Sequence, residues 1–431
     1  MTAWTLPIVA ALLMAYGAFS ARLRTTVVSR AMIFLASGLL LGSGLQVIDV
    51  GAANQVVSLL AEATLVLVLF TDASVVSLGG LRRWHTLPAR LLGIALPLTI
   101  GAGTLAALAV FPQLSVWEAA ALATILAPTD AALGLPVITN ERVPLRIREG
   151  LNVESGLNDG ICVPLLIIFL TIAESGEGVA HVEPVRVIVE EIGYGLLGGA
   201  VAGAVGAVVL RTFLAKRWMS GSWRQINAVT TPLLAYTATD AMGGSGFVAA
   251  FVAGLIYSAV AGPHITTPST LLAKESGELL NAVTFLVFGA VLLAPALSAL
   301  DWRVAVYAVA SLTAVRMVPV ALALLGTSSR APTVGFLGWF GPRGLASIVF
   351  VLILVERTEL AGRDLIVDVV TWTVTLSVLA HGLTARPAAS RYATWHTAQT
   401  VEHKPDRRAS GSFLRRGGGG GSRRSFRHEP P

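Results

Sequence analysis

The sequence predicts an all-α polytopic membrane protein. Its mean hydropathy is +0.73, and only 13% of its 431 residues are charged, a composition that does not suit a surface facing water. Apolar runs of about 20 residues recur along almost the whole chain, and a helix of that length crosses about 30 Å of hydrocarbon. Polar or Gly/Pro-rich breaks separate these runs, so no room is left for a soluble catalytic domain.

We expect about thirteen transmembrane helices. The eighth and ninth are separated only by Met242, Gly243 and Gly244, so a count of twelve is the alternative. The predicted spans cover residues 4–21, 27–48, 56–76, 86–111, 115–139, 151–173, 187–212, 226–241, 243–262, 276–298, 303–326, 332–355 and 366–386.

Charge in the loops predicts which way the chain is oriented. The loops after the first, third, fifth and seventh spans carry thirteen Lys and Arg residues, whereas those after the second, fourth and sixth carry only Arg186. Cytoplasmic loops are enriched in Lys and Arg. We therefore expect a multi-pass protein of the cell membrane with its N-terminus outside and, for an odd number of spans, its C-terminus in the cytoplasm.

Residues 387–431 are predicted to form a basic, disordered cytoplasmic tail after a transmembrane domain of residues 1–386. From residue 388 the tail holds nine Lys and Arg against three acidic residues, together with the Gly417–Gly421 run. A segment with so few apolar residues does not fold alone. The anionic lipids of the inner leaflet are the expected partner, and a solvated tail without a dedicated partner is the alternative. No nucleic-acid partner is expected.

Ionisable residues inside the spans are the positions most informative about function. A charge in the hydrocarbon region is expensive and usually marks an ion or proton path. Glu62 and Asp240 are expected near span ends as interfacial carboxylates. The others are Asp72 in the third span, Asp130 in the fifth, Glu154 and Asp159 in the sixth, Arg316 in the eleventh and Arg343 in the twelfth.

Two spans are predicted to be broken helices. Pro128 removes a helical hydrogen bond in the fifth span and frees backbone carbonyls beside Thr129 and Asp130. The twelfth span carries a comparable break at Gly341-Pro342-Arg343-Gly344. Interrupted helices at corresponding places in two halves indicate a transporter whose inverted repeats bring two crossing breaks together near the midplane. A simple kink at Pro128 is the alternative.

The sixth span begins with a cluster of polar residues. Ser155 and Asp159 are four apart and share one helical face, while Glu154 and Asn158 share the adjacent face. A dehydrated monovalent cation needs several oxygens and one negative charge to replace its water. Asp159 can supply the carboxylate, Ser155 a hydroxyl and the frayed backbone at Thr129 a carbonyl. A polar helix cap would explain Glu154 or Asn158, but it explains Asp159 poorly because an apolar run follows.

These segments resemble the monovalent cation:proton antiporters of the sodium/hydrogen exchanger family, in the prokaryotic, electroneutral branch with an Asn-Asp pair. The most specific match is Glu154-Ser-Gly-Leu-Asn-Asp-Gly160, followed by Pro128-Thr-Asp130. Phe340-Gly-Pro-Arg-Gly344, Arg316 with Pro319, and the stretch from Gly246 to Gly254 support it. The resemblance extends from about residue 4 to residue 386 and implies the sodium/proton antiporter fold with inverted repeats and a homodimeric assembly.

The resemblance also implies roles for individual residues. Asp159 would bind cation and proton alternately, with Ser155, the Thr129 backbone and Asp72 completing the coordination. The family often has Glu at the third-span position, so the shorter Asp72 could act through a bridging water. Glu154 would pair with Arg343, Asn158 would support that geometry, and Asp130 would offset the positive half-helix ends at the break. Arg316 belongs to the supporting set.

The expected function is therefore secondary active exchange of Na⁺ for H⁺ by alternating access, with no resident cofactor. Asn158 stands where electrogenic relatives have a second Asp, which predicts a one-for-one, electroneutral cycle. A K⁺/H⁺ antiporter of the same fold is the first alternative. A channel is disfavoured because charge is concentrated at two crossing breaks rather than along a continuous wet path. An enzyme is not expected, since no His-Glu-x-x-His, Gly-x-Ser-x-Gly or phosphate-cradling motif occurs.

Overall fold

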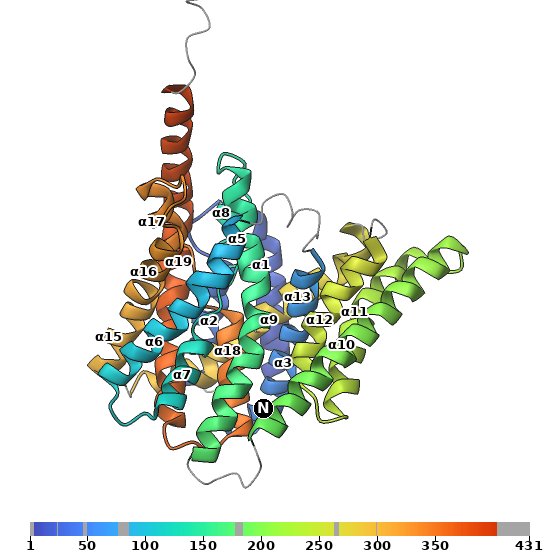
Figure 1. Ribbon diagram of the computed structural model, residues 1–431, viewed down its shortest axis with the longest axis horizontal. Coiled ribbons are helices and arrows are strands. Elements are labelled where there is room, and N and C mark those ends of the chain that lie inside the picture. The colour runs from blue at the N-terminus through green and yellow to red at the C-terminus, as the bar shows by residue number, and fades with distance from the viewer. Residues whose placement is uncertain are drawn as a thin grey trace, which may run out of the picture.

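Every regular element in the described part of the chain is a helix (Figure 1). The computed structural model describes residues 4–23, 25–45, 50–75, 86–176, 184–262, 267–298 and 300–402. The helices are α1 (Thr5–Leu23), α2 (Arg30–Leu39), η1 (Leu40–Gly44), α3 (Val50–Val75), α5 (Thr86–Arg90), η2 (Leu91–Ala95), α6 (Leu96–Val110), α7 (Val116–Ile125), α8 (Leu135–Ile138), α9 (Leu145–Gly176), α10 (Pro184–Ala215), α11 (Gly221–Asp240), α12 (Gly246–Ala261), α13 (Thr267–Phe288), η4 (Gly289–Leu293), α14 (Ala294–Ala296), α15 (Trp302–Leu312), α16 (Ala314–Ala323), α17 (Ala331–Trp339), α18 (Leu345–Arg357) and α19 (Arg363–Glu402).

These elements group into thirteen passes that correspond to the predicted spans. Seven described helices are long and apolar enough to cross a membrane, and α2 with η1, α7, α12 and α18 are shorter apolar helices. Helices that directly continue one another, such as α5, η2 and α6, make one pass, and the broken pairs α7/α8 and α17/α18 make one each. The chain begins at the lower edge of the bundle in Figure 1 and α19 ends at its upper edge. Ends on opposite faces require an odd number of passes, which favours thirteen over twelve.

The helices divide into two groups with α9 between them (Figure 1). On one side α10 packs on α11 and α12, and α13 packs on α2, α3 and α11; on the other side α6 packs on α7 and α16, and α15 on α19. Glycines allow the closest contact, because a Cβ on Gly199 or Gly203 would lie 2.8 Å from the Cα of Ala249 or Ala253. α9 contacts both groups, through α7 on one side and α3, α10 and α12 on the other.

The two predicted breaks are present. α7 begins with a capping box, in which Ser115 accepts from the amide of Glu118 and Glu118 accepts from the amide of Ser115. It ends at Ile125, three residues before Pro128, and the chain is not helical again until α8. α17 ends at Trp339, and α18 begins only after the Gly341–Gly344 segment. Proline accounts for both ends, because its ring blocks the bond that would continue the helix.

The last helix extends into the segment that was predicted to be a disordered tail. α19 does not stop near residue 386 but continues through Pro387 to Glu402. Ala389, Tyr392 and Ala393 recur at helical spacing and are buried, and the Tyr392 ring stacks on Phe336 of α17 with centroids 4.1 Å apart. This apolar face holds the last turns against α17. The rest of the predicted tail, residues 403–431, lies outside the described residues.

Candidate functional site

The two broken helices satisfy each other's backbone groups where they cross. The amide of Asp130 donates to the carbonyl of Pro342 at 2.7 Å. Arg343 Nη1 donates to the carbonyls of Ala127 and Pro128 at 2.7 and 3.1 Å, and Ser347 Oγ donates to the carbonyl of Ile125 at 2.7 Å. The carbonyls left free by the end of α7 therefore find donors on the other broken helix, as buried backbone groups require.

Opposite charges lie at opposite helix ends within this crossing. Asp130 Oδ2 accepts from the amide of Leu345 at 3.1 Å, at the start of α18, while its Oδ1 accepts from the amide of Ala132 at 2.8 Å. The fully buried guanidinium of Arg343 lies against the carbonyl end of α7. A carboxylate at a helix N-terminus and a cation at a C-terminus both oppose the partial charges there. Asp130 thus lies at a half-helix end of the break, the position expected for it.

A ring of short contacts joins α9 to the first break. Ser155 Oγ donates to the carbonyl of Thr129 at 2.5 Å and accepts from the amide of Ala131 at 2.8 Å. Asn158 Nδ2 donates to the hydroxyl of Thr129 at 2.8 Å. Since Thr129, Ser155 and Asn158 are all buried, these bonds fix the α9 face that carries Asp159 beside the irregular backbone.

Asp159 is buried one residue beyond this ring. Its side chain is 7% exposed, and its Oδ1 has no hydrogen-bond partner among the described residues. A buried carboxylate oxygen without a donor is unfavourable unless a proton or a cation satisfies it. This atom is therefore one of the buried polar atoms of the site, and it is one that a proton or a cation could satisfy.

Asp72 approaches the same face of α9 from α3. A Cβ on Gly156 would lie 3.2 Å from the Cβ of Asp72, so the absence of a side chain at Gly156 makes room for this approach. The structure thus brings together Asp159, Ser155, Thr129 and Asp72, the residues expected to bind the ion.

The predicted pair between Glu154 and Arg343 is not the pair that forms. Glu154 Oε1 lies 2.5 Å from Nη2 of Arg316 on α16, and both side chains are almost fully buried. Arg343 instead donates to the end of α7. Sequence reasoning assigned the partner incorrectly because it could not show that the side chain of Arg316 on α16 reaches Glu154 on α9, and two arginines were available for one carboxylate.

Sequence reasoning also missed the residues that hold the second break in place. Ser377 of α19 accepts from the amide of Arg343 at 2.6 Å. The neighbouring His381 is fully buried, and its two ring nitrogens lie 3.0 and 2.9 Å from the carbonyls of Ser377 and Trp339. One serine in an apolar helix gave no signal. The other in-span acids lie away from the site, with Glu62 accepting from Tyr236 at 2.9 Å and Asp240 exposed at the end of α11.

A small pocket reaches Thr129 and Ser155 from the α8 side. It is lined by Thr129, Asp130 and Ser155 together with Pro342 and residues of α8 and α9. Polar oxygens thus line an approach to crossing broken helices in a bundle of membrane-spanning length. These features together are typical of transporters that bind a small ion within the membrane.

Comparison with known proteins identifies the family. The family model described as sodium/hydrogen exchanger, transmembrane, matches residues 8–391, and the chain belongs to this family. It is 28% identical over 307 residues to an uncharacterized Na⁺/H⁺ exchanger of Mycobacterium tuberculosis, a match covering 64% of this chain and 54% of that protein. It is 27% identical over 281 residues to the Na⁺/H⁺ antiporter NhaP of Pseudomonas aeruginosa, covering 62% of this chain and 64% of the relative. The chain spans about half the length of the mycobacterial relative.

A solved structure shares the fold. The sodium proton antiporter MjNhaP1 from Methanocaldococcus jannaschii at pH 8 aligns with a TM-score of 0.74 at 16% sequence identity, covering 90% of this chain and 98% of that one. This confirms the predicted antiporter fold.

Proposed function

We propose that this chain is a secondary active antiporter that exchanges Na⁺ for H⁺ by alternating access, with Asp159 as the carboxylate that binds either ion. The observation that carries the proposal is the buried Oδ1 of Asp159, which lacks a partner in the described part of the protein. A proton or a cation would satisfy this atom, and both could not do so at once. Competition for one carboxylate couples the two fluxes.

The surrounding oxygens suit a small hard cation. The Thr129 carbonyl and the Ser155 hydroxyl are in contact, and each oxygen retains a lone pair that could face an ion. With the Asp159 carboxylate they supply one charge and two neutral ligands, and Asp72 adds a further oxygen directly or through water. Carboxylate, carbonyl and hydroxyl oxygens are the ligands that hard cations prefer. K⁺ uses the same ligand types, so a K⁺/H⁺ antiporter is the second candidate.

The remaining predicted residues support this site without contacting the ion. Asn158 holds the Thr129 hydroxyl. Asp130 and Arg343 balance the two broken-helix ends, and Arg316 neutralises Glu154 one turn before Asn158. Glu154 is paired with Arg316 and Asn158 cannot titrate, so among these α9 residues Asp159 is left to carry protons, which favours a one-for-one, electroneutral cycle.

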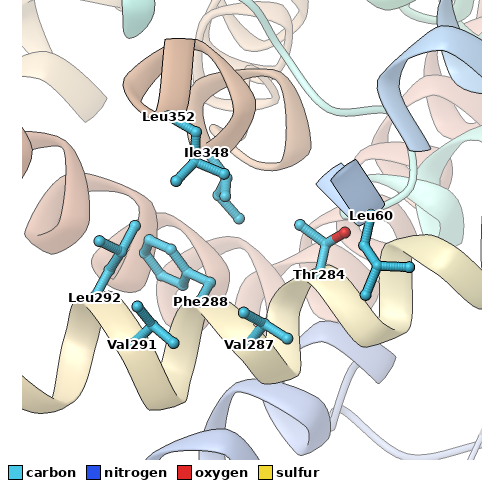
Figure 2. A pocket seen from close by; sticks show the side chains of 8 residues that line it. All are labelled: Leu60, Thr284, Val287, Phe288, Val291, Leu292, Ile348 and Leu352. Atoms are coloured by element: carbon cyan, nitrogen blue, oxygen red, sulfur yellow. The ribbon is translucent and has the colours of Figure 1, made fainter. Parts of the chain in front are cut away.

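Alternating access is supported by an apolar closure on the far side of the breaks. Figure 2 shows Ile348 and Leu352 of α18 facing Phe288 of α13 across a very small pocket. The pocket is lined by Leu60, Thr284, Val287, Phe288, Val291, Leu292, Ile348 and Leu352. α18 leads from Asp130 toward this closure, whereas the polar pocket at Thr129 and Ser155 lies on the other side. A path that is polar on one side and apolar on the other favours a transporter over a channel.

We further propose that the chain resides in the cell membrane with its N-terminus outside, so that the apolar closure faces outward and α19 ends in the cytoplasm. The arginine-rich loops support this orientation. A homodimer, and contact of the basic residues after Glu402 with anionic lipids, complete the proposal.

The test is exchange in proteoliposomes with an imposed pH gradient and a panel of Na⁺, K⁺ and Li⁺ salts, using the parent and Asp159→Asn. The parent should dissipate the pH gradient when Na⁺ is added. Asp159→Asn should be inactive although folded, because an amide neither takes up a proton nor balances the cation's charge. Asp240→Asn is the matched control, since Asp240 is exposed at the end of α11, and it should exchange normally. Normal Na⁺-driven proton movement in Asp159→Asn would refute the assignment.

A further inference from the structure

A second cavity lies at the end of the bundle where α19 terminates. Its volume is about 230 Å³, compared with about 20 Å³ for the pocket at Thr129 and Ser155. It lies between the start of α9, the start of α17 and the last turns of α19. None of the residues assigned to the ion site lines this cavity, so the cavity is separate from that site.

The wall of this cavity is positively charged without a counter-charge. Arg146 and Arg330 both line it, and no Asp or Glu does. Arg146 makes one long hydrogen bond, from Nη2 to Thr86 Oγ1 at 3.5 Å, and Arg330 Nη1 donates to the amide oxygen of Gln399. Within the described ranges neither guanidinium is paired with a carboxylate. Each therefore retains several N–H donors, in the fork geometry that matches phosphate.

Helix ends and hydroxyl groups also favour the binding of an anion in this cavity. α9 begins at this cavity directly after Pro144, and α17, nine residues long, begins there directly after Arg330. Their N-termini contribute partial positive charge at the cavity. Ser328 and Ser329, in the loop before α17, line the same wall. Positive charge and serine residues thus converge from three segments.

The opposite wall is aromatic. The buried Tyr392 is fixed by a 3.0 Å hydrogen bond between its hydroxyl and that of Thr333, and its ring lies 5.5 Å from that of Trp395. Trp395 is half-buried, so part of its indole remains available to a ligand. A flat apolar surface facing two guanidiniums suits a molecule that joins an anionic group to a planar or apolar one.

We propose that this cavity binds a phosphate-bearing anion, with Arg146 and Arg330 on the phosphate and Trp395 against the group that carries it. The phosphate could belong to a soluble organic phosphate or to a phospholipid headgroup, since both present the same chemistry to the arginines. The bound anion would contact α9, α17 and α19 together and would stabilise their packing, because it binds only when all three are in place.

The test uses the full chain in nanodiscs of phosphatidylcholine, with ATP and inorganic phosphate as soluble probes and phosphatidylglycerol, mixed into a second set of nanodiscs, as the lipid probe. We expect saturable binding of at least one probe, one per chain, together with a raised melting temperature. The double substitution Arg146→Gln with Arg330→Gln should weaken this binding at least about tenfold, because it removes two charge-assisted contacts. Arg146→Lys with Arg330→Lys should retain part of it and shows whether the altered cavity still folds.

Two controls distinguish a specific binding site from non-specific attraction of anions to positive charge. Arg415→Gln with Arg416→Gln makes the same change in charge in the basic C-terminal segment, and Arg303→Gln removes a positive charge at the other end of the bundle. Both should bind ATP and inorganic phosphate as the parent does, and Arg303→Gln should also bind phosphatidylglycerol as the parent does. ATP or phosphate binding in phosphatidylcholine would identify a soluble ligand, and retention of phosphatidylglycerol alone would identify a headgroup. Absence of binding for every probe, or an equal loss in the controls, would overturn the proposal. Binding is measured without transport, so it does not depend on the proposed exchange.

Discussion

The partner of Glu154 provides the sharpest test of the buried electrostatics. Glu154 is 2% exposed and Arg316 1%, and their charged atoms are 2.5 Å apart. Replacing Arg316 by Met removes the counter-charge and leaves a carboxylate in a low-dielectric interior. Breaking a buried pair in this way destabilises proteins by about 3–5 kcal/mol. Arg343→Met should also destabilise the protein, but by releasing the carbonyls of Ala127 and Pro128 rather than by exposing the charge of Glu154.

Double-mutant cycles separate these two causes. Glu154→Gln should recover much of the loss in the Arg316→Met background, giving a coupling energy of roughly 1–3 kcal/mol for residues in direct contact. The coupling between Glu154→Gln and Arg343→Met should be less than half as large, because Glu154 pairs with Arg316 whereas Arg343 donates to backbone carbonyls of the first break. Unfolding in mixed micelles of dodecyl maltoside and SDS, followed by tryptophan fluorescence, measures all the free energies. Equal coupling in the two cycles, or a larger one with Arg343, would refute the assignment of the pair.

Three further predictions follow from the site. Ser155→Ala removes a donor to the Thr129 carbonyl and an acceptor for the Ala131 amide. Because these bonds are worth roughly 1–2 kcal/mol, the substitution should raise the KM for Na⁺ about tenfold. An unchanged KM would contradict a role in coordination. Gly344→Ala should lower the melting temperature, because its Cβ would collide with the Asp130 carboxylate. Gly335→Ala is the matched control. Its Cβ would meet no atom within 4 Å, so this variant should melt like the parent. Exchange with the membrane potential clamped by K⁺ and valinomycin, after K⁺ is shown not to be a substrate, should be insensitive to voltage; a two-for-one cycle would gain about 2.3 kcal/mol per 100 mV and respond steeply.

The sequence predicted the bundle well because its strongest signals are local. Hydropathy located the passes, and Pro128 and Pro342 located the two breaks, since proline acts on the backbone immediately around it. The ends of α19 were predicted less well. The basic residues and the Gly417–Gly421 run after residue 386 suggested a disordered tail, whereas the apolar face formed by Ala389, Tyr392 and Ala393 keeps the helix intact. Tertiary packing outweighed the overall composition there.

The candidate site was predictable in its residues but not in all its partners. Asp159, Ser155 and Thr129 belong to two short motifs, and helical spacing was enough to bring Ser155 and Asp159 to one face. The partner of Glu154 depends on the side chain of Arg316 on α16 reaching α9, and the role of Ser377 depends on how α19 passes the second break. Neither relation can be predicted from a single sequence, because both concern the arrangement of helices that are far apart along the chain.

The hydrogen bonds between the two broken helices affect how the protein inserts into the membrane during synthesis. The carbonyl of Ala127 is paired with a donor 216 residues later in the chain. At 5–20 residues per second, synthesis of the intervening segment takes roughly 10–40 s. During that interval the first break is already in the translocation channel or the bilayer, with polar backbone groups that hydrocarbon cannot solvate. The nascent chain must therefore delay the burial of its fifth pass, or keep it beside water or a membrane chaperone, until the twelfth arrives. Truncation before residue 340 should leave the preceding passes insertable but should leave the carbonyls of Ala127 and Pro128 without the donor that Arg343 provides.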